Sequence, residues 1–140
     1  IHTTLVEGRV GYMPGFEGSF TEDQLDALSQ YVLESSGVEG GTASQVAEGE
    51  KIFKGEIGGC YYCHAESGEG MLSQGSANLT DAVWTVADVP GAVDYEAKLD
   101  AVKGVILGGI NRVMPGWTER LSAEEIKMLT VYVHQLGGGK

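Results

Sequence analysis

The chain has 140 residues, which is room for one domain, or for one domain and a fragment of another. Its net charge of −11, from 20 acidic against 9 basic residues, argues against nucleic acid as a partner. No apolar run in the sequence approaches the ~20 residues of a membrane-spanning helix. The acidity has two interpretations, which are plain solubility and the docking of a basic partner.

Hydrophobic periodicity predicts four helices separated by glycine-rich turns. In chain order they span residues 21–34, 44–54, 93–107 and 122–136. The first and the last begin with a hydroxyl residue that is followed three positions later by Gln or Glu, which is the capping-box pattern. Residues 65–92 are rich in Gly, Ser and Asp, and we expect an irregular loop there. The sequence has almost no strand signal.

Two parts of the chain are copies of each other, related by a shift of 101 positions without a gap. The shift superimposes Met13-Pro14-Gly15-Phe16 on Met114-Pro115-Gly116-Trp117. We therefore expect residues 1–40 to be the C-terminal fragment of a first domain plus a linker, and residues 41–140 to be a complete second domain. We also expect the native chain to continue upstream, with another C-x-x-C-H motif roughly 40 residues before Ile1.

The only two cysteines, Cys60 and Cys63, form a C-x-x-C pair that is followed directly by His64. Such a pair can be a redox disulfide, half of a zinc site, or a haem attachment site. A zinc site would need a second pair of ligands, and a thioredoxin-like motif would be expected beside a βαβ pattern. The adjacent histidine favours haem, because two thioethers can hold the vinyl edge while the imidazole reaches the iron. We predict one covalent haem c at this motif.

A second axial ligand of the iron is expected among the four methionines. A thioether favours ferrous iron, raises the reduction potential and fills the position that oxygen would otherwise take. Met114 is the predicted ligand, because Pro115 and Gly116 place it on a rigid, tight loop. Of the others, Met71 is very near the haem motif, and Met13 has no haem motif of its own. Met128 falls near the apolar stripe of the last helix and is expected in the core.

Several further residues are candidates for the surroundings of the haem. Gly49, inside a predicted helix, indicates the close approach of a second helix, and Tyr132 is the candidate to pack there. Asn78-Leu79 falls where the loop after the haem motif would wrap the proximal side. Three side chains either line the haem and bind its propionates, or serve as ordinary core and surface residues; they are Trp84, Trp117 and Arg112.

Four motifs together carry a family resemblance. They are Gly59-Cys60-x-x-Cys63-His64, Ala77-Asn78-Leu79-Thr80-Asp81-x-x-Trp84, Gly109-x-Asn111-x-x-Met114-Pro115-x-Trp117 and Tyr132-Val133-His134-x-Leu136-Gly137-Gly138. Over nearly its whole length the chain resembles the dihaem cytochrome c subunit of cbb-type haem–copper cytochrome c oxidases. The resemblance implies haem attachment at Cys60 and Cys63, with His64 as the proximal ligand and Met114 as the distal ligand. It also implies a membrane-anchored subunit on the periplasmic side of the bacterial inner membrane.

The expected fold is all-α, of the class I cytochrome c type, with helices wrapped round one haem. The expected function is electron transfer within a cbb-type oxidase, with a donor cytochrome c and the other oxidase subunits as partners. The chain would then be an electron carrier and not a catalyst on its own. The alternatives are a carrier domain of another periplasmic system, such as a dehydrogenase or a nitric oxide reductase, and a haem enzyme or gas sensor with an open iron site.

Overall fold

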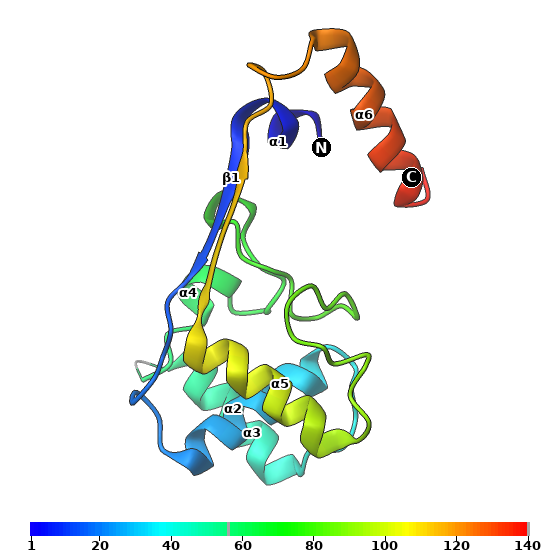
Figure 1. The fold of residues 1–140 in the computed structure, drawn as a ribbon. Coiled ribbons are helices and arrows are strands. Elements are labelled where there is room, and N and C mark those ends of the chain that lie inside the picture. The colour runs from blue at the N-terminus through cyan, green and yellow to red at the C-terminus, as the bar shows by residue number, and fades with distance from the viewer. Residues whose placement is uncertain (56, 140) are drawn as a thin grey trace. The chain divides into compact units, whose positions relative to one another are not determined.

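The computed structural model of the chain describes residues 1–55 and 57–139. The elements, in chain order, are α1 (His2–Glu7), β1 (Gly8–Met13), α2 (Glu22–Ser35), α3 (Ala43–Lys54), α4 (Tyr61–His64), the 3-10 turn η1 (Leu72–Gln74), α5 (Tyr95–Gly108), β2 (Ile110–Pro115) and α6 (Ala123–Leu136) (Figure 1). The four predicted helices are confirmed as α2, α3, α5 and α6. The protein is mostly helical, but the strands depart from the all-α expectation, because β1 pairs with β2 in a two-stranded sheet.

The N-termini of the long helices follow from local side-chain hydrogen bonds. In α2 the Thr21 hydroxyl accepts a hydrogen bond from the Gln24 amide at 3.3 Å, and the Thr21 amide donates to the Gln24 side chain at 3.0 Å. The same reciprocal pair forms at α6 between Ser122 and Glu125, at 3.3 and 2.8 Å. These bonds occupy amides that a helix start otherwise leaves unpaired, so both predicted capping boxes are confirmed.

Packing groups the described residues into two compact units. The larger unit is formed by residues 12–110, and the smaller by residues 1–11 together with residues 111–139. This grouping differs from the predicted division after residue 40. Residues 12–36 pack in the same unit as the C-x-x-C-H motif, whereas the equivalent downstream residues do not. This difference from the predicted division follows from the repeat. Both copies carry the apolar pattern that the larger unit buries, and it is the upstream copy that packs there.

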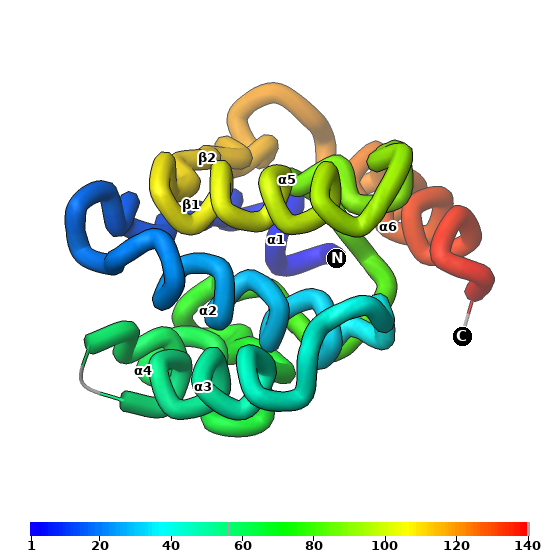
Figure 2. The backbone as a smooth tube through the Cα atoms, turned by 90° about the horizontal axis from the view of Figure 1, so that it is seen from below, coloured from blue at the N-terminus to red at the C-terminus, as the bar shows by residue number. Residues whose placement is uncertain are grey.

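In the larger unit, α2 lies between α3 and α5 (Figure 2). The core is formed by the facing sides of these helices, where Leu28, Leu33 and Phe53 are almost completely buried. The expected close approach at Gly49 is confirmed, because a Cβ atom there would lie 2.1 Å from the Ala27 carbonyl oxygen of α2. The expected partner Tyr132 is wrong, since Tyr31 of α2 packs there instead and Tyr132 is exposed.

In the smaller unit, α1 packs against α6, and Leu5 and Ile126 are its buried residues. Most of the remaining apolar side chains of α6 are exposed; they are Met128, Leu129, Val131, Tyr132, Val133 and Leu136. Met128 was expected in the core but is 64% exposed. Among the described residues of this unit, no helix equivalent to α3 packs against the face of α6 that carries Met128. Within the part of the chain that the structure describes, no helix combines the length and hydropathy needed to cross a membrane.

Candidate functional site

A pocket lined mainly by apolar side chains lies inside the larger unit, beside the C-x-x-C-H motif. Its walls come from α2, α5 and the loop after the motif, through residues such as Leu28, Ile106 and Leu79. The empty space is about 860 Å³ when the opening to solvent is included. Helix α3 completes the wall with Phe53, whose ring centroid lies 6.5 Å from that of His64.

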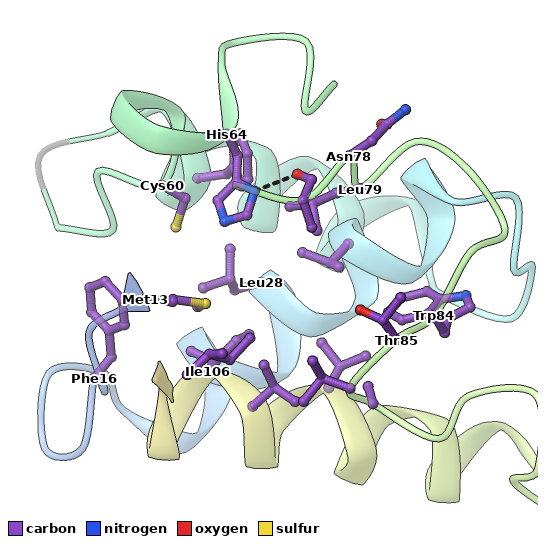
Figure 3. A pocket seen from close by; sticks show the side chains of 18 of the residues that line it. Met13, Phe16, Leu28, Cys60, His64, Asn78, Leu79, Trp84, Thr85 and Ile106 are labelled. Atoms are coloured by element: carbon purple, nitrogen blue, oxygen red, sulfur yellow. Dashed lines mark hydrogen bonds between the residues drawn. The ribbon is translucent and has the colours of Figure 1, made fainter. Parts of the chain in front are cut away.

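His64 is held in the orientation and protonation state that an iron ligand needs. Its Nδ1 lies 2.9 Å from the carbonyl oxygen of Ala77, so Nδ1 carries the proton and donates it to that oxygen. The other ring nitrogen, Nε2, is then left with a free lone pair (Figure 3). Burial lowers the pKa of His64, and the bond to Ala77 offsets part of that shift. A neutral imidazole that lines the pocket can ligate iron.

The two cysteines lie in different surroundings although only two residues separate them. Cys60 lines the pocket and Cys63 is exposed, and both are free thiols. Burial raises the pKa of Cys60 to about 11, with a smaller contribution from Cys63. The Cys60 thiol therefore stays protonated at neutral pH. One thiol in the pocket wall and a second three positions along the same motif suit attachment of a flat ligand by one edge.

The loop after the motif is fastened to the motif by main-chain and side-chain hydrogen bonds. The amide of Gly70 donates to the His64 carbonyl at 2.9 Å, and the Ser76 hydroxyl donates to the Cys63 carbonyl. Further along, the Leu79 amide donates to the Gly68 carbonyl at 2.7 Å. These bonds set Ala77 opposite His64. Asn78 and Leu79 line the pocket, as the expected wrapping of the proximal side requires.

The methionine that the structure brings to the pocket is Met13, not Met114. Figure 3 shows the sulfur of Met13 directed into the same pocket as the imidazole of His64. Met114 belongs to the smaller unit and is 37% exposed, and it lies in strand β2, where a rigid loop was expected. Its role as the distal ligand stays a prediction. Met71 does not line the pocket, and its amide is bonded to the Ser76 hydroxyl at 2.8 Å.

The other aromatic and basic candidates are divided between the units. Trp84 lines the pocket. Trp117 lies in the smaller unit, where the Arg120 guanidinium stands 5.4 Å from the centre of its ring, and Arg112 lies in that unit too. The aromatic residues that sequence reasoning missed are Phe16 and Phe20, which stack with ring centroids 5.6 Å apart and line the pocket. The repeat was the signal for Phe16, because Phe16 is the counterpart of Trp117.

The residues present fit a covalently attached haem c. The pocket offers a neutral imidazole nitrogen, one thiol in its wall and another at the adjacent exposed position, and a thioether that points into the same space. Iron in such haems is ligated by histidine and methionine in electron carriers. The apolar walls contribute few groups that could act as acids or bases on a substrate. The arrangement is therefore suited to holding a redox group.

Comparison with known proteins gives a consistent result. Residues 44–133 match the family described as cytochrome c oxidase, cbb3-type, subunit III. Similar proteins include the Cbb3-type cytochrome c oxidase subunit FixP of Azorhizobium caulinodans, 36% identical over 96% of this chain and 42% of the relative. The FixP subunit of Bradyrhizobium diazoefficiens is 36% identical over 90% of the chain and 39% of its own length. The CcoP subunit of Cereibacter sphaeroides is 35% identical over 100% of the chain and 48% of its own length. The chain thus spans less than half the length of these relatives.

Proposed function

Because the chain belongs to the family of subunit III of cbb3-type cytochrome c oxidases, we propose that it carries electrons within such an oxidase. Cys60 and Cys63 would attach one haem c, and His64 would be an axial ligand of its iron. The observation that carries this proposal is the His64 imidazole, which is fixed by Ala77 and shares an apolar pocket with a methionine sulfur and the Cys60 thiol. When bound, the haem supplies a one-electron couple between ferric and ferrous iron.

A methionine is proposed as the second axial ligand. The sequence predicts Met114, and the structure has Met13 in the pocket, in the equivalent position of the repeat. Either sulfur would favour ferrous iron and leave no position open for oxygen. Whether a methionine binds the iron is therefore a separate question from which of the two methionines binds it.

The side chains around the pocket serve electron transfer in three ways. The Ala77 carbonyl keeps the proton on Nδ1 of His64 and leaves Nε2 for the iron. Leu28, Ile106 and Phe53 give the pocket apolar walls, and an apolar shell around the haem would favour a high reduction potential. Because ligands on both faces and two thioethers would hold the group, its geometry would change little when an electron arrives or leaves.

The charge of the chain supports docking of a basic partner. Residues 12–110 carry 16 acidic against 4 basic side chains, a net charge of −12, and the remaining residues carry 4 against 5, a net charge of +1. The negative field therefore belongs to the unit that holds the haem motif. We propose that it steers a basic donor cytochrome c on the periplasmic side of the membrane, and that the other oxidase subunits are the acceptors.

Two other functions remain as alternatives with distinct expectations. A carrier domain of another periplasmic system would have the same ligands but would not associate with the oxidase. A haem enzyme or gas sensor would have an open iron position, and carbon monoxide would bind to it rapidly. The thioether directed into the pocket favours the carrier.

To test the proposal, the chain is produced in bacteria that have the machinery for covalent haem attachment. We expect the denatured protein to exceed the mass of the polypeptide by one haem, and the double variant Cys60→Ala/Cys63→Ala to lack this increase. The ferric protein should show the weak sulfur-to-iron absorption band, and the ferrous protein should be slow to bind carbon monoxide. Met71→Ala is the control, which should keep the band. Rapid carbon monoxide binding without a sulfur band would favour the sensor or enzyme.

A further inference from the structure

The hydroxyl of Ser76 joins the loop after the haem motif to the motif itself. It donates a hydrogen bond to the Cys63 carbonyl and accepts one from the Met71 amide at 2.8 Å. Ser76 directly precedes Ala77, whose carbonyl accepts the Nδ1 proton of His64. Cys63 directly precedes His64. One side chain thus connects the two main-chain segments that the bond between His64 and Ala77 also connects.

The bond between His64 and Ala77 lies where water can compete with it. Ala77 is exposed, and water offers its carbonyl a donor equivalent to the imidazole. The main chain of His64 is held in α4, where its amide donates to the Cys60 carbonyl at 2.9 Å. The strength of the bond therefore depends on how firmly the Ala77 carbonyl is held in front of the imidazole.

Gly70 holds the same carbonyl by close contact. Its φ of +77° is in the left-handed region, and a Cβ atom there would lie 2.6 Å from the Ala77 carbonyl oxygen. A close contact of this kind blocks movement toward Gly70 but does not oppose movement away from it. The hydrogen bond from Ser76 to Cys63 is attractive, and it supplies the restraint that contact alone does not give.

A second main-chain bond lies beyond Ala77, and it joins one part of the loop to another. The Leu79 amide donates to the Gly68 carbonyl at 2.7 Å, and both residues follow the haem motif. This bond sets the shape of the loop but does not fasten Ala77 to the motif. Ser76 makes such a connection one residue from the carbonyl that His64 uses.

We propose that Ser76 is a positioning residue, whose hydroxyl keeps the Ala77 carbonyl in line with Nδ1 of His64 and thereby lowers the reduction potential of the haem iron. This inference rests on the proposed function, because the potential belongs to the haem that His64 would ligate. A hydrogen bond from Nδ1 makes the imidazole a more basic ligand through Nε2, and a more basic ligand stabilises ferric over ferrous iron. Serine suits this role because its hydroxyl donates and accepts at the same time.

The first experiment compares the haem-loaded wild type with Ser76→Ala, which removes the hydroxyl and both of its bonds. The reduction potential, measured by redox titration, should rise. In the ferrous protein, proton magnetic resonance should show faster exchange of the His64 Nδ1 proton with solvent. We expect an acceleration of about two- to tenfold, the factor that corresponds to the net contribution of one hydrogen bond. A potential that is unchanged or lower would overturn the role of Ser76.

Two matched variants separate the position of this hydroxyl from a general effect of substitution in the loop. Ser67→Ala is the same change at an exposed position, where the hydroxyl donates to Glu69 of the loop itself at 3.2 Å. It should leave the potential and the exchange rate unchanged. Ser76→Thr keeps the hydroxyl and should retain the wild-type values. A rise in potential in either variant as large as in Ser76→Ala would contradict the assignment.

A measurement on the wild type does not depend on whether Ser76→Ala folds. The Met71 amide is bonded to the Ser76 hydroxyl, so its exchange reports the opening of this connection. The Nδ1 proton of His64 should exchange in the same event, with the same dependence on urea and before the amides of α3. A different dependence on urea, or exchange of the Nδ1 proton only together with the amides of α3, would overturn the inference. A wild-type chain that attaches no haem would instead contradict the proposed function itself.

Discussion

Single residues decide how closely the helices of the larger unit approach. Gly49 is buried in α3, and its missing side chain lets the backbone of α2 pass at Ala27. A glycine in the middle of a helix costs about 1 kcal/mol against alanine, so helix propensity alone would favour a larger residue. The contact with α2 reverses that preference, because a methyl group would overlap a carbonyl oxygen.

Gly49→Ala is therefore expected to destabilise the protein by about 1–3 kcal/mol through overpacking, although it improves helix propensity. Gly104→Ala is the matched control, since Gly104 is an exposed residue of α5 whose added Cβ would meet nothing within 4 Å. That variant should be more stable than wild type by about 0.5–1 kcal/mol. Urea unfolding of the two variants measures both effects. Equal stabilisation by both substitutions would show that α2 does not pack at Gly49.

Among the elements, α2 and α6 are equivalent in sequence but differ in what supports them. Helix α2 is packed against both α3 and α5, whereas α6 has one buried side chain, Ile126. The capping box matters more for a helix with little packing. The boxes also differ chemically, because Gln24 does not titrate and Glu125 does.

Acidification should weaken the cap of α6 and leave that of α2 intact. The hydrogen bond donated by the Ser122 amide to the Glu125 carboxylate holds the pKa of Glu125 below its ordinary value of 4.5. Because the pKa of Glu125 is lower in the folded protein than its ordinary value, the stabilisation by this cap is fully present above pH 4.5. It is lost as the pH falls through the pKa of Glu125 in the folded protein. Amide-exchange protection of α6, measured on both sides of this pH and corrected for the intrinsic rate, should fall relative to that of α2.

The control for this effect is Glu125→Gln, which keeps a hydrogen-bond acceptor and removes the titrating group. Protection of α6 in that variant should no longer change with pH relative to α2. If α2 and α6 of the wild type lose protection together, the loss reflects global unfolding and the cap is not its cause.

At the scale of the whole molecule, charge is distributed unevenly between the two units. The larger unit carries −12 and the rest of the chain +1, so almost the entire field originates from the unit with the haem motif. Screening by salt reaches such surface charges readily, since the Debye length at physiological ionic strength is about 8 Å. Solubility alone does not require this concentration of charge in one unit.

The rate at which a basic cytochrome c reduces the haem-loaded chain should fall steeply as ionic strength rises. Stopped-flow measurement across a salt series checks this, with a small uncharged reductant as the control whose rate should change little. A rate with the basic donor that is flat or rises with salt would leave the acidity without a role in docking.

The sequence by itself determined those features that depend on neighbouring residues. The spacing of Cys60, Cys63 and His64 predicted the haem site, and the structure has His64 and Cys60 in one pocket. Capping residues and apolar periodicity predicted the long helices to within two residues, because a helix start is defined by bonds between residues three apart. Family membership, predicted from four short motifs, is confirmed by the match over residues 44–133.

Only the tertiary structure decided which copy of the repeat completes the pocket. Both copies have the same Met-Pro-Gly motif and nearly the same apolar face, so local patterns cannot distinguish them. The choice depends on residues far apart in the chain, such as Lys103 with Asp26 and Gly49 with Ala27. The pairing of β1 with β2 joins segments about a hundred residues apart, and neither segment has the alternating pattern of a half-buried strand. Contacts of this kind depend on the whole packed chain, and no window of sequence contains them.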